Sequence, residues 1–154
     1  MSESKLVLPG RVYYDDLEIG KVHDCGLWEL DPEEMKAFAR QWDPQPFHTD
    51  EAAARDSIYG GLTAASMHIL SLMSIAVFKG PSQPVIIGAL GAEYKIPNPM
   101  RAGEKVSITH CCTSKRLSKS RENAAIVVNN NVMSNQQGEI VLDFTCTVMI
   151  QAYP

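Results

Sequence analysis

The sequence has no run of basic residues. Lysine and arginine total 14, aspartate and glutamate total 18, and the net charge is −4. This balance argues against nucleic acid or an anionic membrane surface as the main partner. A local anion site is the one exception we consider, because four basic residues lie close together: Lys115, Arg116, Lys119 and Arg121.

Long apolar runs and targeting signals are also missing. Residues 62–78 carry no charge, but threonine, serine and histidine interrupt them too often for a membrane span. The first ten residues, MSESKLVLPG, lack the charged-then-apolar pattern of a signal peptide. We therefore expect a cytoplasmic protein that does not associate with membranes.

Cysteine is scarce and has no metal-binding spacing. None of the four cysteines forms a CxxC pair, and the adjacent Cys111 and Cys112 would point to opposite faces of a strand. We interpret them, with Cys25 and Cys146, as small buried side chains in a reducing compartment, and we expect no metal site. Without repeats or low-complexity segments, the 154 residues are predicted to form a single domain, 1–154.

The first clear element is a helix that begins at Asp31. Asp31 suits the N-cap and Pro32 the first helical position. One apolar face follows at helical spacing, made of Met35, Phe38, Ala39 and Trp42. Pro44 should end the helix at Asp43, because it pushes its predecessor out of the helical region. In the segment DPQPFHTD we expect the two prolines to carry the chain away extended, holding His48 a short distance from Asp43.

A second helix is predicted after Gly60-Gly61, over residues 62–78 and ended by Gly80-Pro81. Its surface is apolar except for His68 and one polar stripe, formed by Thr63, Ser66, Ser71 and Ser74. We expect this helix to be buried on nearly all sides.

The remaining sequence alternates like β-strands. Apolar residues recur at every second position in 139–151. Val106, Ile108 and Cys112 alternate similarly with polar residues, and a weaker strand covers 124–133. The segment SNQQG predicts the hairpin turn before the last strand, and the segment IPNPMRAGE predicts a bend between strands. The predicted fold is α+β: an antiparallel sheet of about five strands wrapped around a central apolar helix.

Two segments resemble the MaoC-like dehydratases, which include the R-specific enoyl-CoA hydratases and have the hot-dog fold. DPQPFHTD matches an Asp-x-Asn/Gln-Pro-x-His-x-Asp pattern, and IYGGLTAASMHILSL matches the segment that opens the central helix. The matching residues are Asp43, Gln45, Pro46, His48, Asp50, Tyr59, Gly60 and Gly61. The resemblance covers about residues 15–150.

The resemblance implies hydration or dehydration of a 2-enoyl or 3-hydroxyacyl thioester of CoA. It assigns Asp43 and His48 to a shared water and a backbone N–H at the start of the central helix to the thioester oxygen. Conjugate addition builds negative charge on that oxygen, so a donor there suits the chemistry. No cofactor is implied beyond the CoA of the substrate, and a homodimer or higher homo-oligomer is expected. Which of Asp43 and His48 is the base stays open.

The chain departs from the family pattern at the start of the central helix. Many relatives read Ala-His-Gly where this chain reads Ala64-Ala65-Ser66, so Ser66 replaces the glycine whose N–H meets the thioester oxygen. Ser74 falls where some hydratases carry a serine near the substrate, and Gln45 and Gly61 are further candidate substrate contacts. A hot-dog thioesterase and a catalytically silent acyl-thioester binder remain alternatives.

Three other polar residues are interpreted as structural. We expect Asp50 to cap or orient the loop that carries His48. His68 should be a hydrogen-bonded histidine of the core or of an interface. His110, although it stands beside two cysteines, is not expected to bind a metal, since neighbouring strand residues point to alternate faces.

Overall fold

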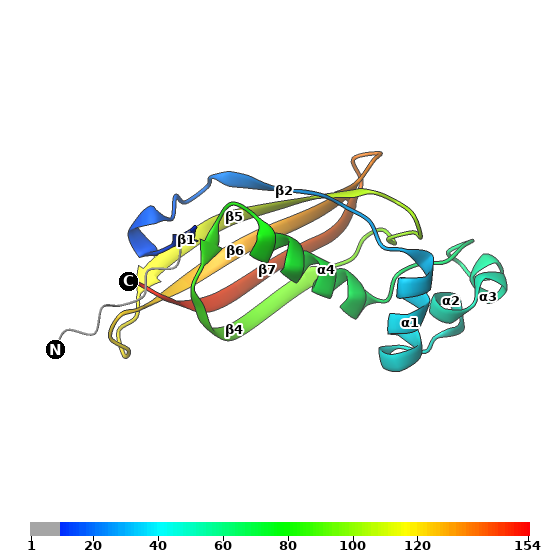
Figure 1. The fold of residues 1–154 in the computed structure, drawn as a ribbon, viewed down its shortest axis with the longest axis horizontal. Coiled ribbons are helices and arrows are strands. Elements are labelled where there is room, and N and C mark those ends of the chain that lie inside the picture. Colours follow the sequence, from blue (N-terminus) through cyan, green and yellow to red (C-terminus); the bar gives the residue numbers. More distant parts are fainter. Residues whose placement is uncertain (1–9) are drawn as a thin grey trace.

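The computed structural model describes residues 10–154, so the N-terminal pattern and the first part of the predicted domain lie outside the described residues. Five antiparallel strands form a sheet in the order β2-β5-β6-β7-β4. They are β2 (Val22–Trp28), β4 (Ile86–Lys95), β5 (Val106–Leu117), β6 (Ala124–Asn135) and β7 (Ile140–Gln151). The long helix α4 (Ser66–Lys79) lies across one face of this sheet (Figure 1). The predicted α+β hot-dog arrangement is confirmed.

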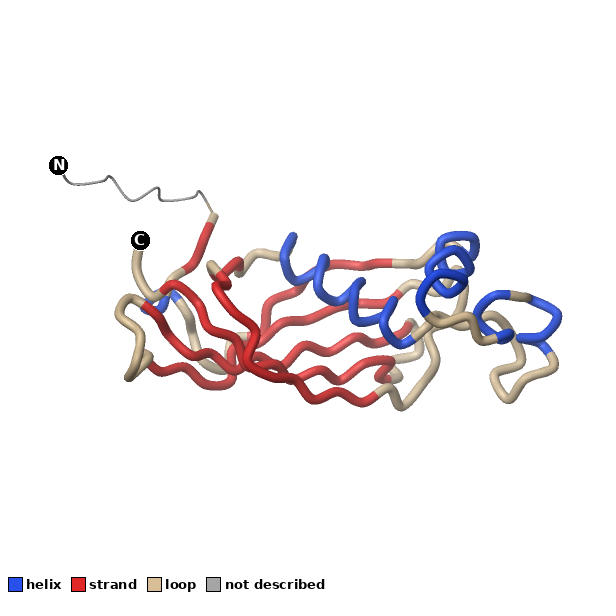
Figure 2. Tube along the Cα trace, turned by 90° about the horizontal axis from the view of Figure 1, so that it is seen from below, coloured by secondary structure: helices blue, strands red, loops and turns tan. Residues whose placement is uncertain are grey.

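Smaller elements flank the two ends of the sheet. Figure 2 shows the short helices gathered beyond the N-terminal end of α4, namely α1 (Pro32–Trp42), α2 (Pro46–Thr49) and α3 (Glu51–Arg55). At the other end, β1 (Arg11–Val12) pairs in parallel with β3 (Gln83–Pro84), and a 3-10 turn, η1, covers Tyr14–Asp16. No helix in residues 10–154 is both long and apolar enough to cross a membrane.

The core lies between α4 and the sheet. Buried and half-buried residues alternate along β5 and β6, because successive side chains of a strand point to opposite faces. The main apolar cluster joins Ile69, Leu72 and Met73 of α4 to the strands, with Ile108 and Met133 fully buried. A second, smaller apolar cluster lies further along the sheet, around Val127, Val148 and Ile150. The alternation predicted from the sequence therefore builds the core.

Helix α1 forms as predicted but buries less of its apolar face. The Asp31 carboxylate accepts hydrogen bonds from the backbone N–H groups of Glu33 (2.9 Å) and Glu34 (3.2 Å). Met35 and Ala39 are fully buried, whereas Trp42 is 66% exposed. Because α1 lies beyond the end of the sheet (Figure 1), its last turn has no layer to pack against.

The central helix differs from its prediction in two ways. It begins at Ser66, because residues 62–64 pair as an extended segment with residues 100–102: Ala64 N–H donates to the Met100 carbonyl (2.9 Å) and Ala102 N–H to that of Leu62 (3.2 Å). The expectation of burial on nearly all sides is wrong for the single chain. One face of α4 stays exposed, formed by Met67, Ser71, Ser74, Ile75 and Phe78. A single sheet covers only one side of a helix.

The two edge strands have weak sequence signals. Strand β2 falls in a segment that the sequence left unassigned, and its pairing with β5 is interrupted by a bulge between Asp24 and Leu27. Gly26, at φ +88°, lies in that bulge. Strand β4, at the other edge, pairs only with β7 within the sheet, and its residues are exposed on both faces. Neither edge strand therefore shows a regular alternation of buried and exposed residues.

The N-cap of α1 gives a first prediction. Asp31→Ala removes the acceptor for two backbone N–H groups and should destabilise the fold by about 1 kcal/mol. For a chain of this size the melting temperature should fall by about 2–4 °C. Asp31→Asn keeps an acceptor oxygen and should melt close to the wild type in a circular dichroism experiment. Equal losses in both variants would contradict the capping role.

Candidate active site

Asp43 and His48 meet across a turn that is folded more tightly than expected. Asp43 is the C-cap of α1, and its N–H donates to the Ala39 carbonyl at 2.8 Å. The predicted extended path to His48 is wrong, because Pro46 takes the first position of α2, where its missing N–H costs nothing. Gln45 N–H bonds to the Asp43 carbonyl (2.8 Å) and His48 N–H to that of Gln45 (2.9 Å). This turn places Asp43 Oδ2 3.7 Å from His48 Nε2.

The orientation of the His48 ring is fixed from its other side. The residue is 8% exposed, and its Nδ1 lies 2.7 Å from the Thr63 carbonyl oxygen. A carbonyl only accepts hydrogen bonds, so Nδ1 carries the proton. In the neutral ring Nε2 then has a free lone pair on the side of Asp43. His48 can thus take up a proton at the atom nearest the carboxylate.

The gap between the pair suits a shared water. A separation of 3.7 Å is too long for a direct hydrogen bond between Asp43 Oδ2 and His48 Nε2. A water molecule at hydrogen-bonding distance from both atoms fits this spacing. Two groups that each take up or release a proton would then contact the same oxygen, which is the arrangement of a general acid–base pair.

The start of α4 is connected to this pair through Thr63. Thr63, whose carbonyl holds His48, precedes the first helical residue, Ser66, by three positions. The N-cap, Ala65, is extended, with φ −61° and ψ 145°. The first N–H groups of a helix have no acceptor within the helix and point along its axis, where the dipole is positive. Ser66 therefore offers a backbone donor suited to an oxygen that gains negative charge.

For two other predicted substrate contacts, Gln45 and Gly61, the structure shows only local hydrogen bonds and packing. The Gln45 side chain is exposed. Its backbone carbonyl stabilises the turn by accepting hydrogen bonds from His48 N–H and from Thr49 Oγ1. Gly61 is half-buried, and a Cβ there would lie 3.6 Å from Arg101 Nη1, which donates to the Tyr59 carbonyl at 2.6 Å. A role of Gln45 or Gly61 in substrate binding stays a prediction.

A cavity of about 630 Å³ opens between α4 and the sheet. The predicted contact Ser74 lines it, together with Leu70, Met73, Val77 and Phe78 of the same helix. Asp43 and His48 do not line the cavity. Leu70, the nearest lining residue of α4, is four positions after Ser66, which is about 6 Å along a helix. The cavity lining on α4 therefore begins one helical turn after Ser66 and runs to Phe78.

The sequence interpretation missed the inner wall of this cavity. His110, Asn129 and Asn131 line it and are buried in the sheet. The signal for them is the run Asn129-Asn130-Asn131 inside a strand, because asparagine is depleted from strands.

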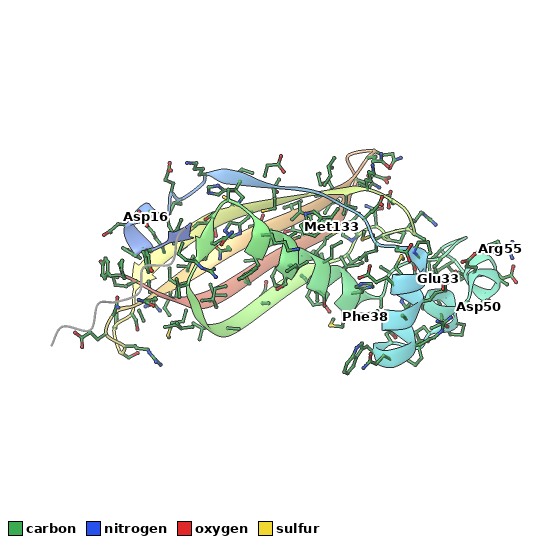
Figure 3. The ribbon with its side chains drawn as sticks, in the orientation of Figure 1. Asp16, Glu33, Phe38, Asp50, Arg55 and Met133 are labelled. Carbon is green, nitrogen blue, oxygen red and sulfur yellow. The ribbon has the colours of Figure 1, made fainter. Side chains whose placement is uncertain are left out.

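Asp50 has the predicted capping role. It is the N-cap of α3, and its carboxylate accepts from Ala53 N–H at 2.8 Å. Figure 3 labels it among the short helices, at the same end of the molecule as Phe38 and Glu33 of α1.

His68 is buried between α4 and α1. Its ring stacks on Phe38 at 4.4 Å between centroids, and its Nε2 lies 3.6 Å from Glu34 Oε1. The predicted core position of His68 is confirmed. The predicted hydrogen bonding is not complete, because Nδ1 is buried without a partner. Burial lowers the pKa of His68, although Glu34 opposes this shift.

The cysteines and His110 show no metal site. Cys25 and Cys112 are buried, Cys111 and Cys146 are half-buried, and all four are free thiols. Within residues 10–154 no three side chains of histidine, cysteine, aspartate or glutamate are grouped as metal ligands.

Solved structures resemble this chain over nearly its whole length. A MaoC-like dehydratase from Rhodospirillum rubrum is 35% identical, with a TM-score of 0.84 over 93% of this chain and 99% of that one. An R-hydratase from Pseudomonas aeruginosa is 22% identical (TM-score 0.69; 92% and 86% of the two chains). A 3R-hydroxyacyl-ACP dehydratase complex from Mycobacterium tuberculosis is 24% identical (TM-score 0.70; 85% and 96%). The last two similarities establish the fold alone.

Sequence comparison gives the family. No curated protein matches the chain. Residues 18–135, however, match the MaoC like domain family, and this range contains Asp43, His48, the whole of α4 and most of the sheet. With the match covering most of its length, the chain belongs to the MaoC-like family of hot-dog proteins.

Proposed function

We propose that the protein is a hydratase or dehydratase that acts on 2-enoyl and 3-hydroxyacyl thioesters of CoA. The observation that carries this proposal is the pair of Asp43 and His48, 3.7 Å apart, with the proton of the neutral His48 ring fixed on the far nitrogen. Membership of a family that includes dehydratases supports the reaction class. CoA enters as part of the substrate, and no other cofactor takes part in the proposed reaction.

In the hydration direction, a water held by the pair attacks C3 of the enoyl thioester. The proton that the water loses passes to His48 Nε2 or to the Asp43 carboxylate, and the electrons of the double bond move onto the thioester oxygen. The resulting enolate then takes a proton from the pair at C2, which completes the addition of one water. Holding the water between two fixed groups lowers the entropic cost of the attack.

The thioester oxygen is assigned to the backbone N–H of Ser66. This donor lies at the positive end of a 14-residue helix, and it strengthens its hydrogen bond as the oxygen becomes charged. An acyl chain whose thioester occupies this position can extend along α4 into the cavity beside Leu70 and Ser74. The walls are mostly apolar, which suits an acyl group.

The acid–base pair gives a second prediction. Asp43→Asn and His48→Ala should each lower kcat on crotonyl-CoA at least about 100-fold, the contribution of a positioned acid–base group, with modest change in KM. The double variant should lose much less than the product of the two single losses, because the groups act on one water. Loss of absorbance of the enoyl thioester measures the rate.

Asp50→Asn is the matched control, because Asp50 caps α3 seven residues from Asp43. It should keep near wild-type turnover. Wild-type rates in either single variant would make the pair structural. Thiol release by the wild type in place of hydration would identify a thioesterase, and binding of thioesters without any reaction would identify a silent acyl-thioester binder.

Ser66 gives a third prediction. Proline is tolerated at the first position of a helix, and the extended Ala65 is compatible with a following proline. Ser66→Pro should therefore fold while losing the N–H, and kcat should fall by about 100-fold or more. Ser66→Gly keeps the N–H and should stay active on crotonyl-CoA. A folded and active Ser66→Pro protein would place the oxyanion donor elsewhere.

We also propose that the protein is a homodimer joined through β4. This edge strand carries large apolar side chains that are exposed in the single chain and do not line the cavity, Ile87 and Tyr94. Its outer edge has no partner within the described sheet, and an open edge of this length readily pairs with another chain. The exposed apolar residues of α4 outside the cavity, Met67 and Ile75, add further surface for a partner to cover.

The dimer gives a fourth prediction. Light scattering at micromolar concentration should give twice the chain mass of 17.0 kDa. Ile87→Lys places a charge on the β4 edge and should shift the mass toward the monomer, whereas Leu117→Lys, on the similarly exposed end of β5, should not. A monomeric wild type, or equal effects of the two variants, would contradict pairing through β4.

A further inference from the structure

A band of polar side chains crosses the face of the sheet that α4 covers. It consists of His110 on β5, Asn129 and Asn131 on β6, and Cys146 on β7. The strand register places His110 opposite Asn131 and Asn129 opposite Cys146, so the four side chains are neighbours. The histidine and both asparagines are each less than 5% exposed.

This polar band separates the two apolar clusters of the core. On β6 it lies between Val127 of the smaller cluster and Met133 of the larger one. Figure 3 labels Met133 in the sheet. Buried amides in the middle of a strand oppose both burial and strand formation. A core built only for stability would continue the apolar rows on either side, so the band calls for another explanation.

The hydrogen bonds of the polar band are not complete. His110 Nδ1 lies 2.7 Å from Asn131 Oδ1, and Asn131 Nδ2 donates to Cys146 Sγ at 3.8 Å. Both ends of the Asn131 amide are thereby used. Asn129 Oδ1, in contrast, is fully buried without a partner. This oxygen is an acceptor that lacks a donor.

His110 supplies a second acceptor. Because Asn131 Oδ1 only accepts, the proton of the neutral ring lies on His110 Nδ1, which leaves a lone pair on Nε2. Burial, opposed by the bond to Asn131 and reinforced by the nearby His23, lowers the pKa of His110, which favours the neutral ring. The polar band therefore offers two acceptors, an amide oxygen and an imidazole nitrogen.

All four residues of the polar band line the cavity that also contains Leu70, Ser74 and Phe78. Two acceptors without a positive charge repel an anion, so a carboxylate does not fit the inner wall. Arg11 is the one cationic side chain among the described residues that line the cavity, and its guanidinium lies 5.1 Å from the centre of the Phe78 ring. A neutral hydrogen-bond donor is the complementary group.

We propose that the cavity binds an acyl group that carries a hydroxyl or an amide N–H remote from the thioester, and that this donor bonds to Asn129 Oδ1. The inference rests on the proposed action on acyl thioesters and narrows the substrate class within it. The unsubstituted part of the chain would contact the apolar wall formed by Leu70, Met73 and Val77. Discrimination against a plain alkyl chain follows, because a methyl group would leave the buried acceptor unpaired.

Binding of unreactive thioesters tests this directly. The probes are saturated ω-hydroxyacyl-CoA thioesters with four to eight acyl carbons, each compared with the plain acyl-CoA one carbon longer, which has a methyl group in place of the hydroxyl. We expect at least one hydroxyl member to bind about tenfold tighter than its methyl partner in isothermal titration calorimetry. Equal or weaker binding of the hydroxyl member at every length would overturn the inference. Tighter binding of an (ω−1)-keto thioester of similar length, whose carbonyl only accepts, would overturn it as well.

Asn129→Leu and Asn130→Leu form a matched pair of variants. Asn129 faces the cavity, whereas Asn130 lies on the other face of β6 and bonds to Asp143 Oδ1 at 2.8 Å. The preference for the hydroxyl should disappear in Asn129→Leu and persist in Asn130→Leu. Loss in both, or persistence in both, would remove Asn129 from the site. Should a variant fail to fold, the series on the wild type decides alone.

The same preparation separates this inference from the proposed reaction. Hydration of crotonyl-CoA without any preference for the hydroxyl thioesters would refute the polar-band site and support the proposed hydratase reaction. A hydroxyl preference in a protein that hydrates no enoyl-CoA would support the site and refute the reaction. The two proposals therefore fail independently.

Discussion

One sheet can cover only one side of a helix, and the arrangement of this chain follows from that constraint. Helix α4 places Ile69, Leu72 and Met73 against the strands and leaves Ile75 and Phe78 on its open side. The sheet ends near the start of α4, so the short helices have to close the core there (Figure 2). The same geometry leaves edge strand β4 unpaired on one side. Core, candidate site and proposed interface are thus arranged around a single helix.

The hydrogen bond from His48 Nδ1 to the Thr63 carbonyl connects these parts at the candidate site. His48 belongs to the short helices, whereas Thr63 belongs to the extended segment that pairs with residue 101 and leads into α4. One bond therefore fixes the proton on the imidazole and also connects His48, one of the proposed acid–base pair, to the start of the helix. Residues 18 positions apart, His48 and Ser66, can in this way keep a constant relative position.

The sequence predicted those features that local patterns specify. The α1 cap at Asp31, the strand alternation and the proximity of Asp43 and His48 all follow from neighbouring residues. The start of α4 could not be predicted, because residues 62–65 are as apolar as the helix and only pairing with residues 100–102 makes them extended. The two prolines between Asp43 and His48 predict an extended chain, but Pro46 begins a helical turn. Strand β2 contains a bulge at Gly26, and β6 contains three consecutive asparagines. Glycine and asparagine are both depleted from strands, so these two segments have weak strand signals.

The strand order also determines when this chain can fold. In the order β2-β5-β6-β7-β4, the three inner strands are the last three in the sequence, and the two outer strands come first. Within the sheet β4 pairs only with β7, so it stays unpaired on the ribosome until β7 has been synthesised. Until then the sheet beside α4 lacks β7 and β4. Folding of such a chain waits for long-range contacts, and its nascent form exposes apolar surface to which a chaperone can bind.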